Sequence, residues 1–417
     1  MPLALNGAQF KRHWPIGETE TVLAQRWDAL IAAKPAERAK LFRETSGWKT
    51  TKTVKGDLPG SNEPSVFAAT SANKRPKTIR YAYRAFDRHF ALYDFRLGDR
   101  LRPPLYHGYS DAQVFLTTLF TNALAQGQAV AATSLMPDLH HFRGSFGGKD
   151  IIPLYRDAEA KQPNVTVGLL ETLGEQYGAQ PSAEDLAAYI YAVLGGQSYT
   201  QRFWNELETP GPRVPLTKDG KIFTAAVALG KRLLWLHTYA ERFRGKERGD
   251  EVPAGLAKSL KGVSSHPTKY PEKCSYEEAT REILVGDGRF GPVDPEVWEF
   301  EVSGLKVVQS WLGYRMKKRA GKKSSALDDI RPDHWTPQMT DEFLELLWVL
   351  EGSLSMEPEL SAMLDKIATG PCFKGTDLPV PTEAQREAPA LALATGDLLE
   401  IMEADDDESD GEDELNA

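Results

Sequence analysis

The spacing of hydrophobic residues changes character along the chain. Near the N-terminus, apolar residues recur at three- and four-residue intervals, which places them on one face of a helix. These residues are Val22, Leu23, Trp27, Leu30 and Ile31. The pattern predicts a helix over residues 18–34 that is stopped by Pro35. A polar stretch rich in Gly, Pro, Ser and Lys follows over residues 50–77, which is typical of a linker or a long loop.

Short aromatic runs with alternating polarity begin at residue 79. The runs at residues 79–83, 90–95, 130–133 and 151–155 are separated by Gly, Asp and Pro, so we expect four strands. After Gln180 the spacing becomes helical. Ser182 and Asp185 form a capping pattern ahead of an apolar stripe that stops at Gly195. Further helices are expected over residues 222–243, 305–319 and 341–356.

These patterns predict a mixed α+β fold divided into four segments. We expect a helical extension and linker over residues 1–78 and a strand-rich unit over 79–175. A mainly helical unit should occupy residues 176–395, and a disordered acidic tail residues 396–417. The tail prediction depends on charge, because a dense run of like charges with little to bury does not fold.

Charge is distributed unevenly along the chain. The 417 residues contain 50 basic and 59 acidic residues, for a net charge of -9. Eleven of the acidic residues follow Gly396 without a single Lys or Arg. Removing those eleven from the 59 leaves 48 acidic residues against 50 basic ones. A slightly cationic body therefore carries an anionic tail.

Several classes of protein are excluded by composition. The longest apolar run, residues 226–236, is interrupted by Lys231 and Arg232, whereas a membrane helix needs about 20 apolar residues. The N-terminus has no secretory pattern, so we expect a cytoplasmic protein. Cys274 and Cys372 are the two cysteines, and they lack the spacing of a disulfide framework or a structural zinc site.

Catalytic motifs are not found. The sequence has neither the Asn/Asp/Ser-Pro-Pro-aromatic loop of DNA amino-methyltransferases nor a phosphate-binding loop. The glycine-rich segment 285–291 is followed by Pro292 where a helix should start. Asp138, with His140 and His141, has no second ligand cluster beside it, which favours a turn over a metal site. We expect no methyltransferase, helicase or nuclease activity, and no cofactor, in this chain alone.

Two basic segments suggest contact with polyphosphate. The first runs from residue 298 to residue 332, and its cationic candidates are Lys306, Arg315, Lys317, Lys318, Arg319, Lys322 and Lys323. The alternative is an ordinary solvated charged loop. In this segment Trp298 and Trp311 are expected to be core residues.

The second basic segment, residues 80–88, interleaves arginines with aromatic rings. Its candidates for DNA contact are Arg80, Tyr81, Arg84 and Arg88, because guanidinium groups bind phosphates or guanine edges and aromatic rings stack on bases. The alternative is an internal ion-pair network in which Arg84 and Arg88 bind Asp87. Arg143 and Lys149 are further candidates for reading bases.

Several sequence blocks together resemble one known family. They are LAQRWDALIA, YAYRAFDRHFALYD, DLHHFRGSFGGKDIIPLY, DLAAYIYAVLGGQSYTQRFWNEL and LVGDGRFGPVDPEVWEFEVSGLKVVQSWLGYRMK. In this order they resemble the C-terminal specificity region of Type ISP restriction-modification enzymes, over roughly residues 6–390. One departure is Ala85, which stands where relatives often carry proline.

The resemblance implies a function and partners. Family members join a nuclease, a helicase, an adenine-N6 methyltransferase and a target-recognition domain in one polypeptide. This chain would be the recognition part, as a separate subunit or a fragment. It would bind double-stranded DNA and present it to a methyltransferase or helicase-nuclease partner that holds S-adenosylmethionine, ATP and magnesium. The alternative is an interaction subunit that docks on the methyltransferase chain and contacts DNA little.

The acidic tail generates a prediction about DNA binding. If the tail competes with DNA for the basic surface, truncation after Gly396 should raise DNA affinity and steepen its salt dependence, because more counterions are then released on binding. Fluorescence anisotropy over a series of salt concentrations measures both. Unchanged affinity and slope would leave the tail with a solubilising role only.

Overall fold

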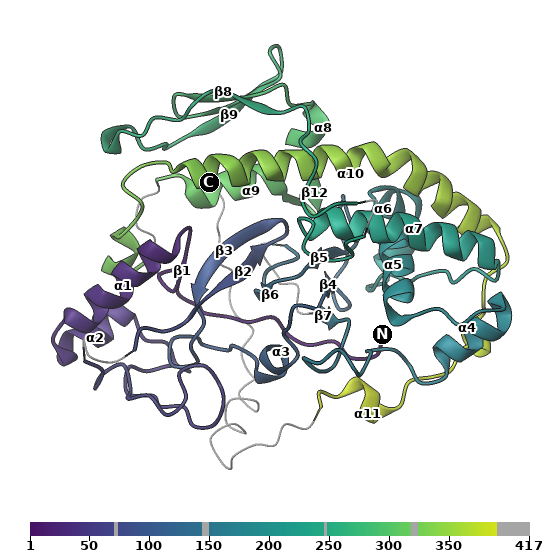
Figure 1. Cartoon of the computed structure of the whole chain (residues 1–417), viewed down its shortest axis with the longest axis horizontal. Coiled ribbons are helices and arrows are strands. Elements are labelled where there is room, and N and C mark those ends of the chain that lie inside the picture. Colours follow the sequence, from purple (N-terminus) through teal and green to yellow (C-terminus); the bar gives the residue numbers. More distant parts are fainter. Residues whose placement is uncertain (71–73, 144–149, 246–247, 318–323, 390–417) are drawn as a thin grey trace.

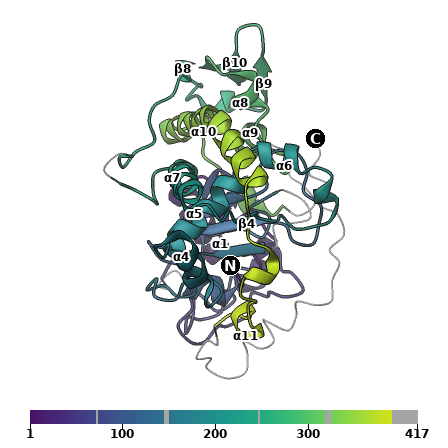
Figure 2. The same ribbon diagram turned by 90° about the vertical axis from the view of Figure 1, so that its right-hand side faces the viewer.

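Two small β-sheets occupy the middle of the molecule, and long helices cover one side of them (Figure 1). The computed structural model describes residues 1–70, 74–143, 150–245, 248–317 and 324–389. Turning the view by 90° shows a third sheet that projects beyond the long helix α10, Pro337–Thr369 (Figure 2). The α+β class expected from the sequence is confirmed.

The N-terminal region forms two short helices. Helix α1, Glu20–Ala32, starts at Thr19, whose side chain accepts a hydrogen bond from the Val22 amide. Helix α1 ends before Pro35, as expected, and Pro35 is itself the first residue of a second helix, α2, Pro35–Phe42. Proline fits this position since the first helical amide has no partner within the helix.

The expected linker is a packed part of the core. Val54, Leu58 and Val66 are buried, in one cluster with Trp14 and Trp27. The buried guanidinium of Arg38 binds several main-chain carbonyls of this region, and its partners are Ile31, Ala33, Val66, Phe67 and Ala69. The polar composition of the segment therefore concealed the few apolar side chains that anchor it.

The first sheet has the order β1-β3-β2-β6. Its strands are β1, Ile16–Gly17, β2, Thr78–Arg84, β3, Asp87–Leu92, and β6, Met136–Pro137. Strands β2 and β3 form a tight hairpin around Ala85 and Phe86. The second sheet has the order β5-β4-β7 and consists of β4, Phe115–Thr118, β5, Ala131–Thr133, and β7, Asp150–Pro153. All four expected strands lie in these sheets.

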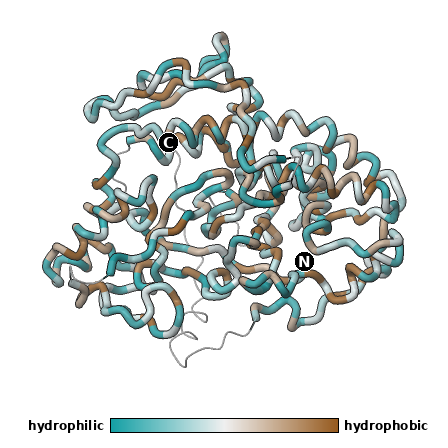
Figure 3. Tube along the Cα trace, in the orientation of Figure 1, coloured by the Kyte–Doolittle hydropathy of each residue, from teal (hydrophilic) through white to brown (hydrophobic). Residues whose placement is uncertain are grey.

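Helices follow the second sheet along the chain. They are α4, Leu169–Tyr177, α5, Ala183–Leu194, α6, Ser198–Arg202, and α7, Gly220–His237, followed by α10. The capping pattern at Ser182 and Asp185 is confirmed as a reciprocal capping box. Hydrophobic positions alternate with hydrophilic ones from turn to turn along α7 and α10 (Figure 3). Each helix therefore turns an apolar stripe toward the core.

The third sheet lies in the segment expected to be helical. It consists of β8, Lys258–Lys261, β9, Cys274–Glu277, β10, Glu282–Val285, and β11, Gly288–Gly291, in the order β8-β11-β10-β9. Its strands are short, and Ile283, Val285 and Phe290 are its buried anchors. Residues 258–291, inside the segment expected to be mainly helical, thus form a four-stranded sheet.

The remaining elements are short. They are the helices α3, Pro103–His107, α8, Pro295–Trp298, α9, Val307–Arg315, and α11, Glu383–Arg386, and the strands β12, Glu301–Val302, and β13, Leu305–Lys306. Single 3-10 turns lie at Glu206–Glu208, Pro267–Lys269, Ala326–Asp329 and Gly375–Asp377. Helices expected over 305–319 and 341–356 correspond to α9 and α10.

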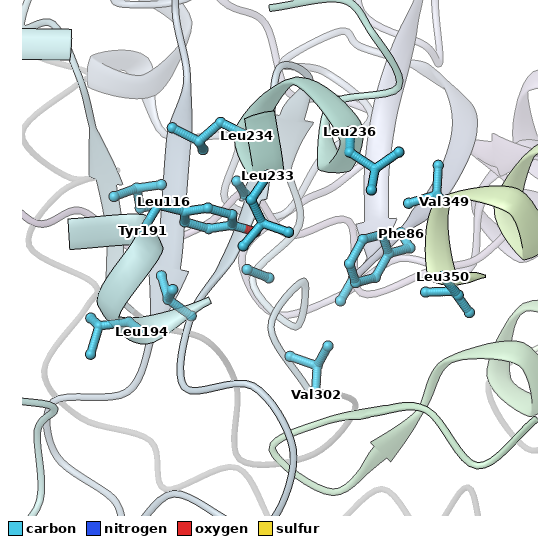
Figure 4. Packing of buried hydrophobic residues seen from close by; sticks show 14 of the residues in the cluster. Phe86, Leu116, Tyr191, Leu194, Leu233, Leu234, Leu236, Val302, Val349 and Leu350 are labelled. Atoms are coloured by element: carbon cyan, nitrogen blue, oxygen red, sulfur yellow. The ribbon is translucent and has the colours of Figure 1, made fainter. Parts of the chain in front are cut away.

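One hydrophobic cluster contains residues from both sides of the expected boundary at residue 175. Phe86, from the tip of the β2–β3 hairpin, lies beside Leu236 of α7 and Val349 and Leu350 of α10 (Figure 4). The acidic segment 396–417 lies outside the described residues. Within the described part of the chain, no helix is both long and apolar enough to cross a membrane.

His237 ties three helices together inside this cluster. Its Nδ1 lies 2.6 Å from the Tyr191 hydroxyl of α5, and its Nε2 lies 2.7 Å from the Ser353 hydroxyl of α10. His237 is therefore a packing residue of the core. Burial lowers its pKa to about 3, and burial with the nearby Arg84 lowers the pKa of His141 to about 3.

The two buried histidines predict acid sensitivity. Their pKa values are lower in the folded protein than the ordinary 6.5, so the unfolded chain binds protons more readily. Their stabilising effect is complete above pH 6.5 and is lost as the pH falls toward 3. In this window, each histidine should reduce the free energy of unfolding by about 1.4 kcal/mol for every unit by which the pH falls.

Urea unfolding between pH 5 and pH 6.5 measures this slope. In His237→Gln the histidine contribution should fall by about half, since one of the two groups no longer titrates. The exposed residue His266 provides the control substitution His266→Gln, which should leave the slope unchanged. An unaltered slope in His237→Gln would refute the assignment.

Candidate nucleic-acid interface

The arginine-aromatic segment 80–88 points mostly into the protein. Phe86 adopts a left-handed backbone conformation, with φ of 63°, at the hairpin tip. Its ring packs edge-on against His237 and Phe300. The tip of the hairpin thus lies between helices, and the neighbouring residues Arg84, Ala85 and Asp87 are buried as well.

Arg84 and Tyr81 share the carboxylate of Asp138. Arg84 Nη1 donates to Asp138 Oδ1 at 3.0 Å, and the Tyr81 hydroxyl donates to Asp138 Oδ2 at 2.8 Å. All three side chains are buried. Burial opposes ionisation of Arg84, but the surrounding Tyr83, Tyr314 and Asp138 raise its pKa above the ordinary value. Tyr81 and Arg84 are therefore not presented to DNA, which corrects the prediction for both.

Asp87 is the acceptor of a second buried network. Arg315 of α9 donates to its Oδ1 at 2.9 Å, and His89 Nε2 lies 3.0 Å from its Oδ2. Burial raises the pKa of Asp87, but Arg315 and His89 outweigh that effect and lower it to about 2. The Arg315 side chain is 1% exposed, so Arg315 is a structural residue and not a phosphate ligand.

Arg88 completes the attachment of the hairpin. Its guanidinium forms an ion pair with Glu345 of α10 and stacks on the Tyr239 ring, 3.5 Å from the centroid. The alternative of an internal ion-pair network is therefore correct for Arg84 and Arg88, although the partners are Asp138 and Glu345. Asp87 binds Arg315, from a segment 228 positions away.

The cations of the first basic segment, residues 298–332, lie in different environments. Lys306 contacts two carboxylates, of Glu299 at 2.8 Å and Glu301 at 3.3 Å, so its charge is already compensated. The pKa of Lys306 is raised, chiefly by the hydrogen bond to Glu299. Lys317 is exposed, with Glu272 at 3.8 Å. Lys318, Arg319, Lys322 and Lys323 lie outside the described residues.

Arg80 is the candidate of the hairpin that lies nearest the surface. It is partly exposed, and its guanidinium lies 5.2 Å from the Phe90 ring centroid. Its Nε and Nη2 atoms are themselves buried and make no hydrogen bond to the described residues. The exposed Lys74, Arg75 and Lys77 precede it along the chain, and Arg75 pairs with Asp28. The start of β2 therefore lies beside several exposed cations.

Arg143 lies beside an exposed loop of the second sheet. Its Nη1 donates to the Ala123 carbonyl at 3.3 Å. Ala123 belongs to the connection between β4 and β5, which we call the Phe120 loop, residues 119–128. Residues 120–123 of this loop are exposed in succession. Lys149, the other candidate in this region, lies outside the described residues.

Sequence reasoning overlooked two exposed aromatic residues, one of them in the Phe120 loop. Phe120 is 40% exposed, and Trp204, in the loop after α6, is 44% exposed. The loop with Trp204 reaches the Phe120 loop at Gly211, where a side chain would contact Phe120. Both aromatics lie in segments that carry no periodic signal, and the pattern analysis had therefore assigned them no role.

The described residues contain no group of His, Cys, Asp and Glu that could hold a metal ion. Asp138 is occupied by Arg84 and Tyr81, which explains the acidic residue beside His140 and His141. The glycine-rich segment 285–291 is the β10–β11 hairpin, with Gly286 at a φ of 58° in the turn. It therefore turns a strand back on itself and does not open a phosphate-binding helix.

Comparison with known proteins identifies the family. Residues 1–346 match the family described as Type ISP C-terminal specificity domain. The chain belongs to this family. No curated protein sequence matches it. The Type ISP specificity domain of this protein thus includes both basic segments and the four sheets of the described residues, while the C-terminal two thirds of α10 lie beyond the matched residues.

Solved structures share the fold of this Type ISP domain. The cryo-EM structure of a DrdV–DNA complex is 18% identical, with a TM-score of 0.58, over 87% of this chain and 36% of that one. The ATP-dependent Type ISP restriction-modification enzyme LlaBIII bound to DNA is 15% identical, with a TM-score of 0.57, over 87% and 23%. A nuclease-deletion mutant of the Type ISP restriction-modification enzyme LlaGI in complex with a DNA substrate mimic is 16% identical, with a TM-score of 0.54. That match covers 87% of this chain and 33% of that one. The chain thus spans about a quarter to a third of these proteins.

Replacing the Arg315 side chain, and so breaking the buried Asp87–Arg315 pair, should cause a large loss of stability. Arg315→Met should lower the free energy of unfolding by about 3–5 kcal/mol, because a buried carboxylate loses its counterion. The exposed pair Arg75–Asp28 supplies the control, since Arg75→Met should cost about 0–1 kcal/mol. Urea unfolding at pH 7 measures both changes.

A double variant separates the buried charge from lost packing. Asp87→Leu added to Arg315→Met should recover much of the stability, since replacing both members of a buried pair with apolar residues is often neutral. No recovery would show that the contribution of Arg315 comes from its packing on Trp311.

Proposed function

We propose that this chain recognises a specific sequence in double-stranded DNA, as the specificity component of a Type ISP-like restriction-modification or phage-defence system. The observation that carries the proposal is the family match over residues 1–346. The DNA-bound state of the solved proteins with this fold supports it. This role implies a cytoplasmic location.

The exposed cations would hold phosphates. Lys74 and Lys77 lie before β2, and Lys317 follows α9. Their ammonium groups are exposed, so binding to a phosphate costs little desolvation. Lys318, Arg319, Lys322 and Lys323 continue the sequence after Lys317, and we include them in this role. Phosphate contacts fix the register of the protein on the duplex but carry no sequence information.

Base recognition would involve surface residues near the sheets. Arg143 is partly exposed, and a guanidinium can bond both acceptors of a guanine edge in the major groove. Arg80 is also partly exposed, and its buried Nε and Nη2 would have to turn outward to make the same pair of bonds. Lys149, six positions after Arg143, belongs to the same proposal. Tyr81, Arg84, Arg88 and Arg315 have no part in it, because each is engaged inside the protein.

A partner would supply the chemistry. The solved relatives are about three to four times longer than the part this chain matches. We propose a methyltransferase or helicase-nuclease partner that holds S-adenosylmethionine, ATP and magnesium, to which this chain presents the DNA. If the chain binds DNA only together with that partner, the docking role weighed above becomes the better description.

Substitutions of Lys317 and Lys306 should affect DNA binding differently. Lys317→Ala should weaken binding to all sequences and lower the salt slope by about 0.9, because one phosphate contact and its counterion are lost. Lys306→Ala is the matched control, since Lys306 is already paired with Glu299 and Glu301. Its affinity and slope should stay close to those of the wild type.

The measurement is anisotropy titration of a randomised duplex pool and of the sequence selected from it, at several salt concentrations. It is carried out with and without the partner chain. The absence of any sequence preference in both conditions would refute sequence recognition. An unchanged slope in Lys317→Ala would remove Lys317 from the interface.

A further inference from the structure

The Phe120 loop is held in place by its main chain. The Phe120 amide donates to Asp150 Oδ2 at 2.7 Å, and the Ala125 amide donates to the Ser303 hydroxyl at 3.0 Å. The Thr200 hydroxyl donates to the Gly127 carbonyl at 2.6 Å. Together with the bond from Arg143 to the Ala123 carbonyl, these contacts come from four separate segments of the chain.

The anchored loop leaves its tip exposed. Residues 120–123, Phe-Thr-Asn-Ala, are all exposed, whereas Leu119 and Leu124 on either side are buried. The tip is thus a short rigid projection whose side chains contribute little to the core. A loop without helix or strand that is fixed this firmly is suited to contact a ligand in a defined geometry.

The side chains at the tip are of the types that read an A·T base pair. An asparagine amide has one donor group and one acceptor, which match the N7 acceptor and the N6 donor of adenine in the major groove. A phenylalanine ring or a threonine methyl makes apolar contact with the C5-methyl of thymine. Asn122, Phe120 and Thr121 supply all three within three consecutive positions.

We propose that the tip of the Phe120 loop reads an A·T pair of the DNA target. Asn122 bonds the adenine edge, and Phe120 with Thr121 covers the thymine methyl group. This inference rests on the proposed DNA recognition and adds a specificity-determining element to it. Arg143, bonded to the same loop, is the cation that would hold the neighbouring base or phosphate.

The test uses the duplex selected from the randomised pool and a set of single base-pair changes in it. Asn122→Ala should lose about 10- to 100-fold discrimination at one A·T pair and keep the preference at the other positions. Its salt slope should not change, because no phosphate contact is removed. Thermal unfolding checks that the variant is folded.

A modified base tests the apolar contact separately. Uracil lacks the C5-methyl group, so its substitution for thymine at that pair should weaken wild-type binding several-fold. In Phe120→Ala the same substitution should have a much smaller effect, since the ring that contacts the methyl is already gone. Phe67, 42% exposed in a different region, gives the matched control Phe67→Ala, which should respond to uracil as the wild type does.

Two results would overturn the inference. If Asn122→Ala and Phe120→Ala discriminate as the wild type does while Lys317→Ala still weakens binding, the tip does not read bases and the proposed function stands. If Asn122→Ala weakens binding to all sequences equally, the tip contacts the backbone only. A wild type with no sequence preference would refute the proposed function and the inference together.

Discussion

The burial of Asp87 is the constraint on which the centre of the structure depends. A carboxylate in the protein interior is stable only with a close counterion and further hydrogen bonds, and Asp87 obtains these from Arg315 and His89. The β2–β3 hairpin, next to Asp87, can therefore insert its tip between α7 and α10 only when α9 is also in place. The pair thus joins the beginning of the strand-rich region to residues more than 200 positions later.

A polar interior of this kind favours one arrangement over others. Arg84, Arg88 and Arg315 each bind a carboxylate from a different segment, namely Asp138, Glu345 and Asp87. A shifted hairpin would leave several charges buried without partners, which costs far more than a lost apolar contact. The ion pairs therefore specify how the sheets and helices fit together, and the apolar cluster around Phe86 contributes the larger part of the burial.

The sequence predicted well those elements whose signal is local. The apolar stripe and capping residues of α5 and the alternation in β2 are properties of short segments, so no knowledge of the tertiary structure is needed. The sheet β8–β11 was missed because its strands are four residues long and two of them, β8 and β9, contain no buried residue. The same residue types also serve two purposes. Arginines beside aromatic rings suit a DNA surface and a buried network equally, and only the inward direction of the hairpin decides between them.

The family resemblance recovered what periodicity could not, because it depends on many positions at once. The match over residues 1–346 agrees with the blocks recognised in the sequence. It does not locate the contacting side chains, since the exposure of Phe120 and Lys317 and the burial of Arg315 follow from tertiary packing. Composition alone would have assigned all the cations of the first basic segment, residues 298–332, to one surface.

The way the Phe120 loop is anchored bears on how such a protein could change its target. The four bonds described above end on main-chain atoms of residues 120, 123, 125 and 127. Every amino acid except proline offers those same atoms. Side chains at the tip can consequently be exchanged during evolution or by engineering while the backbone stays where it is. In this loop, main-chain atoms hold the position and side chains would make the contact with DNA. New specificities can therefore arise there without changes in the rest of the fold.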